Sequence, residues 1–184
     1  MPTLIDQIED PNCQLPESAR TILKVLISNL KSLDENIAVL DREIGRRSKE
    51  DPLARRLMTI PGVGPITATA IVALAPAAET FKSGRDFAAW LGLTPLQKST
   101  GGKQRLGATS KMGERTMRRL LIIGSSAVVR QACMRGAPAG SWLARMLERK
   151  PRMLVTVALA NKTARIVWAL LSKGEVYRAP VVAA

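Results

Sequence analysis

The stretch LMTIPGVGPITATA, which runs from Leu57 to Ala70, gives the strongest local indication of the fold. Two apolar runs flank a segment that contains Gly62, Gly64 and Pro65. Glycine permits the positive φ angles of tight turns, and proline is favoured at the first position of a helix. The pattern therefore predicts two short helices within residues 53–75, joined by a tight turn.

This turn resembles a helix-hairpin-helix motif. In such a motif Gly62, Val63 and Gly64 would leave backbone amides uncovered beside the positive end of the second helix dipole. A phosphate bound there accepts several N–H hydrogen bonds without any base being read. The alternative is a tight turn between two helices that binds no ligand.

A long helix is predicted over residues 16–51, with Gly45 and Pro52 marking its end. Its apolar residues follow the heptad spacing of a coiled coil. They are Leu23, Leu26, Leu30, Leu33, Ile37, Leu40 and Ile44, called the seam below. The alternative is an amphipathic helix packed on its own domain. The coiled coil is favoured, with its partner helix in another chain or in a missing part of this one.

The remaining pattern is also helical. Aromatic residues make up 3% of the chain, so the core is expected to be aliphatic, which favours closely packed helices. Helices are predicted at 84–93, 114–134, 140–149 and 152–173, with a polar glycine-rich loop at 94–113, at most a brief strand near Leu93, and a loosely ordered tail at 1–15. The expected fold is mainly α: the coiled-coil helix is followed by a compact helical domain over residues 53–178.

The charge of the chain is strongly positive and unevenly distributed. Lys and Arg number 28 against 15 Asp and Glu, a net charge of +13. From Lys98 to Arg152 there are thirteen basic residues and two acidic ones, so +11 of the +13 lies there. A charge that only kept the protein in solution would be scattered more evenly. The excess therefore predicts a nucleic-acid partner.

Several other classes of protein are disfavoured. Cys13 and Cys133 are 120 positions apart and the chain has no His, so the cysteines indicate reduced thiols and no zinc site. The N-terminus has no basic stretch followed by an apolar run, as a secretory signal would have. The apolar stretches are expected to be too short, or too interrupted by Lys and Arg, to span a membrane. A cytoplasmic protein without a membrane partner is expected.

The glycine-rich segment KSTGGKQRLGATSKMG, residues 98–113, places the hydroxyls of Ser99 and Thr100 beside two glycines. Glycine lets the backbone approach a phosphodiester, and the surrounding cations would stabilise its charge. The phosphate-binding candidates of the segment are Gly101, Gly102, Lys103, Arg105 and Lys111. A hydroxyl here either hydrogen-bonds a phosphate or attacks it as a nucleophile. Contact is favoured over catalysis, since the chain has no His to activate a serine.

The helix that follows begins with Arg115, Arg118 and Arg119, whose spacing predicts one basic side and further phosphate contacts. Lys162 and Arg165 repeat the i, i+3 spacing in a helix rich in Ala, Val and Leu. Metal-dependent phosphoryl transfer needs clustered carboxylates. Ten of the fifteen acidic residues lie at or before Asp51 and the rest are far apart, so no metal site is expected in this chain.

An ordered set of motifs resembles the DEDD insertion-sequence transposases, the "one hundred and ten" group, and the ending is most similar to the "eleven-eleven" subgroup. The similarity runs from about residue 16 to the C-terminus. The motifs are IPGVG at 60–64, WLGLTP at 90–95, STGGK at 99–103, SKMG at 110–113 and ALANK at 158–162.

The resemblance implies properties that the composition does not. Members of the family carry an N-terminal RuvC-like domain with four carboxylates that bind Mg²⁺, then a coiled coil, then the domain found here. This last domain contributes a catalytic serine, which suggests Ser99, with Thr100 as the neighbouring candidate. The resemblance also implies a structured guide RNA that bridges donor and target DNA, and assembly into oligomers.

The chain begins about where the coiled coil of the family begins. It is therefore expected to be a truncated or split C-terminal part, inactive by itself, that binds DNA in transposition or recombination and pairs with itself or with a full-length transposase through the coiled coil. Its expected location is the cytoplasm, on the nucleoid. Two alternatives stay open: a non-catalytic helix-hairpin-helix module that binds nucleic acid, and a coiled-coil interaction protein whose charge is incidental.

Overall fold

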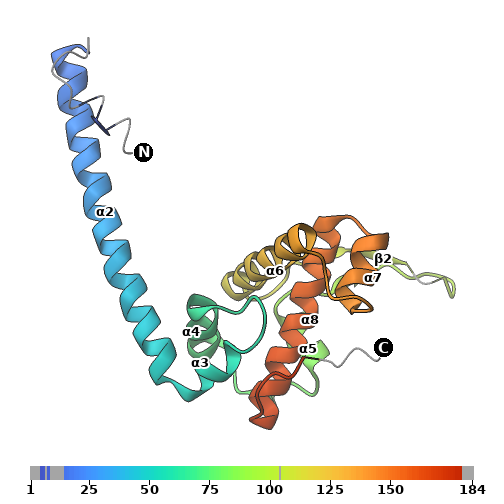
Figure 1. The fold of residues 1–184 in the computed structure, drawn as a ribbon. Helices are drawn as coiled ribbons and strands as arrows, with labels where there is room; N and C mark the ends of the chain where they lie inside the picture. The colour runs from blue at the N-terminus through green and yellow to red at the C-terminus, as the bar shows by residue number, and fades with distance from the viewer. Residues whose placement is uncertain (1–4, 7, 9–14, 104, 180–184) are drawn as a thin grey trace. The chain divides into compact units, whose positions relative to one another are not determined.

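The structure is a computed structural model that describes residues 5–6, 8, 15–103 and 105–179. These residues form helices α2 to α8, a short 3-10 helix η1 and one β-hairpin, joined by turns and loops (Figure 1). Two compact units are present, residues 1–44 and residues 45–184. The fold is mainly α, as predicted. The expected tail at 1–15 lies almost wholly outside the described residues.

Helix α2 (Glu17–Glu50) is one continuous helix of 34 residues, about 51 Å long at 1.5 Å per residue. It runs through Gly45, so the prediction that this glycine helps to end the helix is wrong. One glycine in an exposed helix costs about 1 kcal/mol, which is too little to stop a helix of this length. The end comes at Glu50, because the carboxylate of Asp51 accepts hydrogen bonds from Leu53 N and Ala54 N and caps the next helix.

Helices α3 (Pro52–Leu57) and α4 (Pro65–Leu74) are the two short helices predicted within residues 53–75. Between them, Ile60 and Val63 turn into the core, with exposed fractions of 2% and 5%. The two glycines of the turn differ in backbone conformation. Gly62 has φ +86, whereas Gly64, the N-cap of α4, is extended with φ −94.

Helix α5 (Gly84–Trp90) follows η1 (Ala78–Thr80) and begins at the N-cap Ser83, whose hydroxyl accepts a hydrogen bond from Asp86 N. The aromatic rings of Phe81, Phe87 and Trp90 pack together, with centroids 5.2–5.7 Å apart. Few aromatic residues are therefore enough to form a compact centre beside α5.

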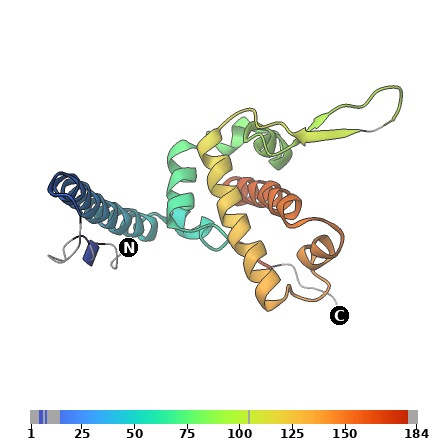
Figure 2. The same ribbon diagram turned by 90° about the horizontal axis from the view of Figure 1, so that it is seen from above.

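The prediction that residues 94–113 form a loop is wrong in part. They contain an antiparallel hairpin of strands β1 (Pro95–Gln97) and β2 (Leu106–Thr109). Gly101 and Gly102 both have positive φ, as the two central residues of a type I′ turn require. Figure 2 shows this hairpin extending away from the helices of its unit. The strands are short and exposed, so they lack the apolar alternation by which strands are predicted.

The core of the second unit is built around α8 (Arg152–Lys173), which packs against α6 (Arg115–Arg135), α5, α7 (Trp142–Arg149) and α3. Among the described residues, α8 is the one helix long and apolar enough to cross a membrane, contrary to the expectation that none would be. Val155, Ala160, Ala164 and Val167 of α8 are fully buried against its neighbours. Its apolar composition is that of a core helix.

Candidate nucleic-acid interface

The base of the hairpin is held by two chain segments that lie backbone to backbone. Ser110 N donates to Thr94 O over 2.9 Å, and Lys111 N donates to Gly92 O over 3.1 Å. A Cβ on Gly92 would overlap the carbonyl of Met112, and one on Gly113 would overlap that of Trp90. Glycine is therefore required on both sides of this contact. The motifs at 90–95 and 110–113 form one structural feature.

Two polar side chains connect this base to the core helices. The Arg118 guanidinium, on α6, donates to Leu91 O over 3.0 Å and to Met112 O over 3.4 Å. Asn161 Nδ2, on α8, donates to Leu93 O over 3.0 Å. Arg118, predicted to contact phosphate, thus has a structural role, while Arg115 and Arg119 beside it are exposed. The helix therefore does not present all three arginines alike.

The tip of the hairpin carries the two candidate nucleophiles. Ser99, Thr100, Gly101, Gly102 and Lys103 are all exposed. The Ser99 hydroxyl oxygen accepts a hydrogen bond from Arg105 N over 3.1 Å, a bond that leaves the hydroxyl hydrogen unused. Thr100 pairs with Lys103 across the turn. The structure thus presents a hydroxyl at the tip of a projecting hairpin, between basic residues.

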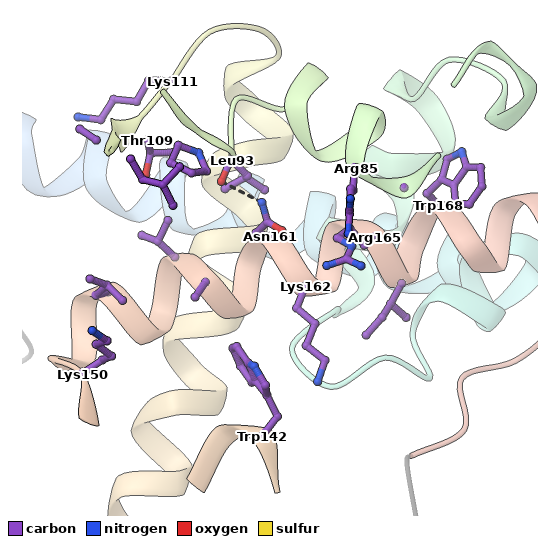
Figure 3. A pocket seen from close by; sticks show the side chains of 18 of the residues that line it. Arg85, Leu93, Thr109, Lys111, Trp142, Lys150, Asn161, Lys162, Arg165 and Trp168 are labelled. Carbon is purple, nitrogen blue, oxygen red and sulfur yellow. Dashed lines mark hydrogen bonds between the residues drawn. The ribbon is translucent and has the colours of Figure 1, made fainter. Parts of the chain in front are cut away.

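An open groove of about 1650 Å³ lies beside the base of the hairpin (Figure 3). Strand β2, the start of α5, the start of α7 and one side of α8 line it. Five cationic side chains contribute to its lining: Arg85, Lys111, Lys150, Lys162 and Arg165. None of the described residues that line the groove is acidic. The charged side chains that line the groove are therefore all positive among the described residues.

Lys162 and Trp142 lie beside each other in the lining of the groove (Figure 3). The Lys162 ammonium lies 4.7 Å from the centroid of the Trp142 ring, within the range of a cation–π contact. Burial lowers the pKa of Lys162, and the positive charges of Arg145 and Arg165 lower it further. An anion between these cations would relieve their mutual repulsion.

The turn predicted to bind phosphate is used partly for packing. Gly62 lies against Gly124 of α6, and a Cβ on Gly62 would come within 2.8 Å of Gly124 O. Val63 is buried, whereas Gly64 is exposed, with open space where a Cβ would lie. Of these three residues, Gly64 alone combines exposure with an uncrowded backbone.

Of the predicted site residues, Lys111 alone lines the groove; Arg105 lies with the tip residues in the hairpin. The sequence did not identify Arg85, Trp142 and Lys150 as site residues. Lys162 and Arg165 were noted for their spacing, which was the one available signal, but were not assigned to a site. Among the described residues, no cluster of three or more Cys, Asp or Glu side chains could hold a metal ion.

Comparison with known proteins relates this chain to transposases. Residues 54–137 match the model of the transposase IS116/IS110/IS902 family. A probable family 20 transposase of Pseudomonas aeruginosa is 47% identical over 164 residues, which is 89% of this chain and 48% of that protein. The transposase for insertion sequence element IS1111A of Coxiella burnetii is 36% identical, over 86% of this chain and 44% of that protein.

The transposase for insertion sequence element IS1328 of Yersinia enterocolitica is 35% identical, over 89% of this chain and 49% of that protein. The chain thus spans about half the length of the curated relatives that it matches. The range matched by the family model, residues 54–137, includes the glycine turn, the hairpin and α6. This chain belongs to the IS116/IS110/IS902 family of transposases.

Proposed function

We propose that this chain is a DNA-binding part of a transposase and acts in DNA transposition and recombination. One observation carries the proposal: an exposed serine lies on a basic hairpin whose base borders a groove lined by five cations and, among its described residues, no acid. Cations arranged in this way bind the phosphate backbone, whatever the base sequence. The kinship with transposases supports DNA as the polyanion.

We propose Ser99 as the nucleophile, with Thr100 as the alternative. Attack of Ser99 Oγ on a DNA phosphorus would form a bond between the serine oxygen and phosphorus and break the bond to one deoxyribose oxygen. The serine loses its hydroxyl proton, and the leaving oxygen takes up a proton to become a hydroxyl. Two features support Ser99: its hydroxyl hydrogen is unused in the bond to Arg105 N, and Lys98, Lys103 and Arg105 surround it in sequence. Nearby cations stabilise the charge that develops on a phosphate under attack.

The metal ions of the reaction are proposed to lie elsewhere. The described residues offer no cluster of three or more metal ligands, so we assign no metal ion to them. Four carboxylates of a RuvC-like domain would hold Mg²⁺, in the same polypeptide or in another. A structured guide RNA, assembly through α2, and a cytoplasmic location on the nucleoid complete the proposal.

The second candidate function is a non-catalytic nucleic-acid-binding module, in which Ser99 only contacts phosphate. The observation that favours it is Gly64, which is exposed and open at the N-terminus of α4. The amides of a helix N-terminus bind phosphate without chemistry. The two functions differ in one observable, the covalent protein–DNA adduct.

The test is to combine the chain with a RuvC-like domain from a close relative, the matching RNA and labelled DNA, and to measure adduct and affinity. Ser99→Ala should abolish the adduct and keep DNA binding within about twofold, because only the attacking oxygen is removed. Thr100→Ala, the matched control, should retain the adduct. Loss with Thr100→Ala alone would move the nucleophile by one position. An adduct that persists in both variants would contradict the assignment to the hairpin tip.

A further inference from the structure

The groove beside the hairpin combines three properties that a duplex-binding surface does not need. It has cations along one side, an aromatic ring in one wall and apolar side chains that are well exposed. Met153 is 69% exposed, Leu154 50% and Leu106 65%, and all three line the groove. Apolar side chains gathered beside cations indicate a ligand that is itself both anionic and apolar.

Resting on the function proposed above, we propose that the groove binds single-stranded or locally unpaired nucleic acid. The phosphates lie along Lys150, Lys162 and Arg165, and unpaired bases pack against Trp142 and the apolar side chains. In a duplex the base faces are stacked on one another, so a duplex would neutralise the cations but leave the apolar side chains uncovered. Stacking on aromatic rings beside a cationic track is how proteins bind single strands.

The geometry of the three cations fits a strand that follows α8. Lys162 and Arg165 lie about one turn apart on α8, and Lys150 lies two residues before α8 begins. Lys162 lies over Trp142, with Arg165 close enough to lower its pKa. A phosphate near Lys162 therefore lies close to Arg165 as well, and its own base lies within reach of the indole ring.

The experiment measures affinity of the full chain for a short labelled DNA strand without self-complementarity, its RNA counterpart and its blunt duplex. Trp142→Leu keeps an apolar side chain but removes the aromatic face. It should weaken single-strand binding about tenfold and duplex binding less than twofold, since stacking of one base changes affinity by a factor of about five to somewhat more than one hundred. Trp142→Phe should restore most of the loss. The DNA and RNA arms show which strand is preferred.

A charge-matched pair of variants tests the cations. Lys150→Gln/Lys162→Gln should lower the slope of log affinity against log salt by about 1.4 for the single strand, at about 0.7 per phosphate contact. Lys49→Gln/Lys173→Gln removes the same charge from exposed positions outside the groove and should change the slope little. Helical content by circular dichroism checks that each variant is folded.

Four outcomes would overturn the proposal. Equal loss of single-strand and duplex binding in Trp142→Leu would make the groove a general phosphate site. Wild-type affinity in every folded groove variant would place the nucleic acid elsewhere and leave the proposed function intact. Binding of an acidic helical peptide in the groove, without competition by single strands, would identify a protein partner instead. Absence of any nucleic-acid binding by the wild-type chain would contradict both proposals.

Discussion

At the scale of single residues, the glycines of the turn between α3 and α4 have different physical roles. Gly62 has φ +86 and lies against Gly124, whereas Gly64 is extended and open. Gly62→Ala should lower the free energy of unfolding by about 2 kcal/mol, because a Cβ is strained at this φ and would press on Gly124 O. Gly64→Ala should change it by less than about 1 kcal/mol.

Urea denaturation of the two variants measures this difference, and equal stability would contradict the packing role of Gly62. The result also decides how phosphate binding at the turn can be tested. Bulky residues at both glycines would unfold the domain before they tested its ligand. Substitution of Gly64 alone keeps the fold and covers the exposed amide.

Arg118 and Arg119 are neighbours of equal charge with opposite expected effects. Arg118→Ala should cost about 1–3 kcal/mol of stability, because the carbonyls of Leu91 and Met112 lose their donor. Arg119→Ala, on the exposed side, should cost less than about 0.5 kcal/mol. In DNA binding the order reverses. Arg119→Ala should reduce the slope of log affinity against log salt by about 0.9, more than Arg118→Ala does. Thermal unfolding and salt titration of the pair measure both effects, and identical behaviour would contradict the division of roles.

At the scale of elements, α2 presents its seam to solvent. Leu26, Leu33, Ile37 and Leu40 are 54–61% exposed. The regular spacing predicts that a second helix covers them. Leu33→Lys should shift the sedimenting species toward monomer, since a charge would be buried between the helices. Ser28→Lys, which adds the same charge opposite the seam, should leave the mass unchanged. A monomer in wild type and variants alike would contradict assembly through α2.

At the scale of the whole molecule, binding to DNA should depend steeply on salt. A net charge of +13, concentrated between residues 98 and 152, favours contacts to phosphate over contacts to bases. With about six phosphate contacts, affinity should fall about 10³-fold between 50 and 200 mM salt. Fluorescence anisotropy across that range measures the slope. A flat response would contradict the electrostatic basis of the proposed function.

The sequence by itself determined the positions of most helices, the distribution of charge and the family, because each of these depends on residues close together in the chain. The bounds of α6, α7 and α8 lie within about two residues of the predictions, since Ser141 caps α7 and Gly174 ends α8. Ser99 and its basic neighbours could be proposed from consecutive residues. The prediction that Gly45 helps to end the long helix is wrong, because the free-energy cost of one glycine is small in a helix as long as α2.

The tertiary structure alone decided what distant residues do together. The hairpin was missed because its strands are short and exposed and are held by pairing with each other and by contacts to residues 90–94. Arg118 and Arg119 differ because one of them faces two backbone carbonyls. The groove brings together Arg85, Trp142 and Lys162 from α5, α7 and α8. No local pattern encodes such proximity, because it arises from the packing of helices that are far apart in the chain.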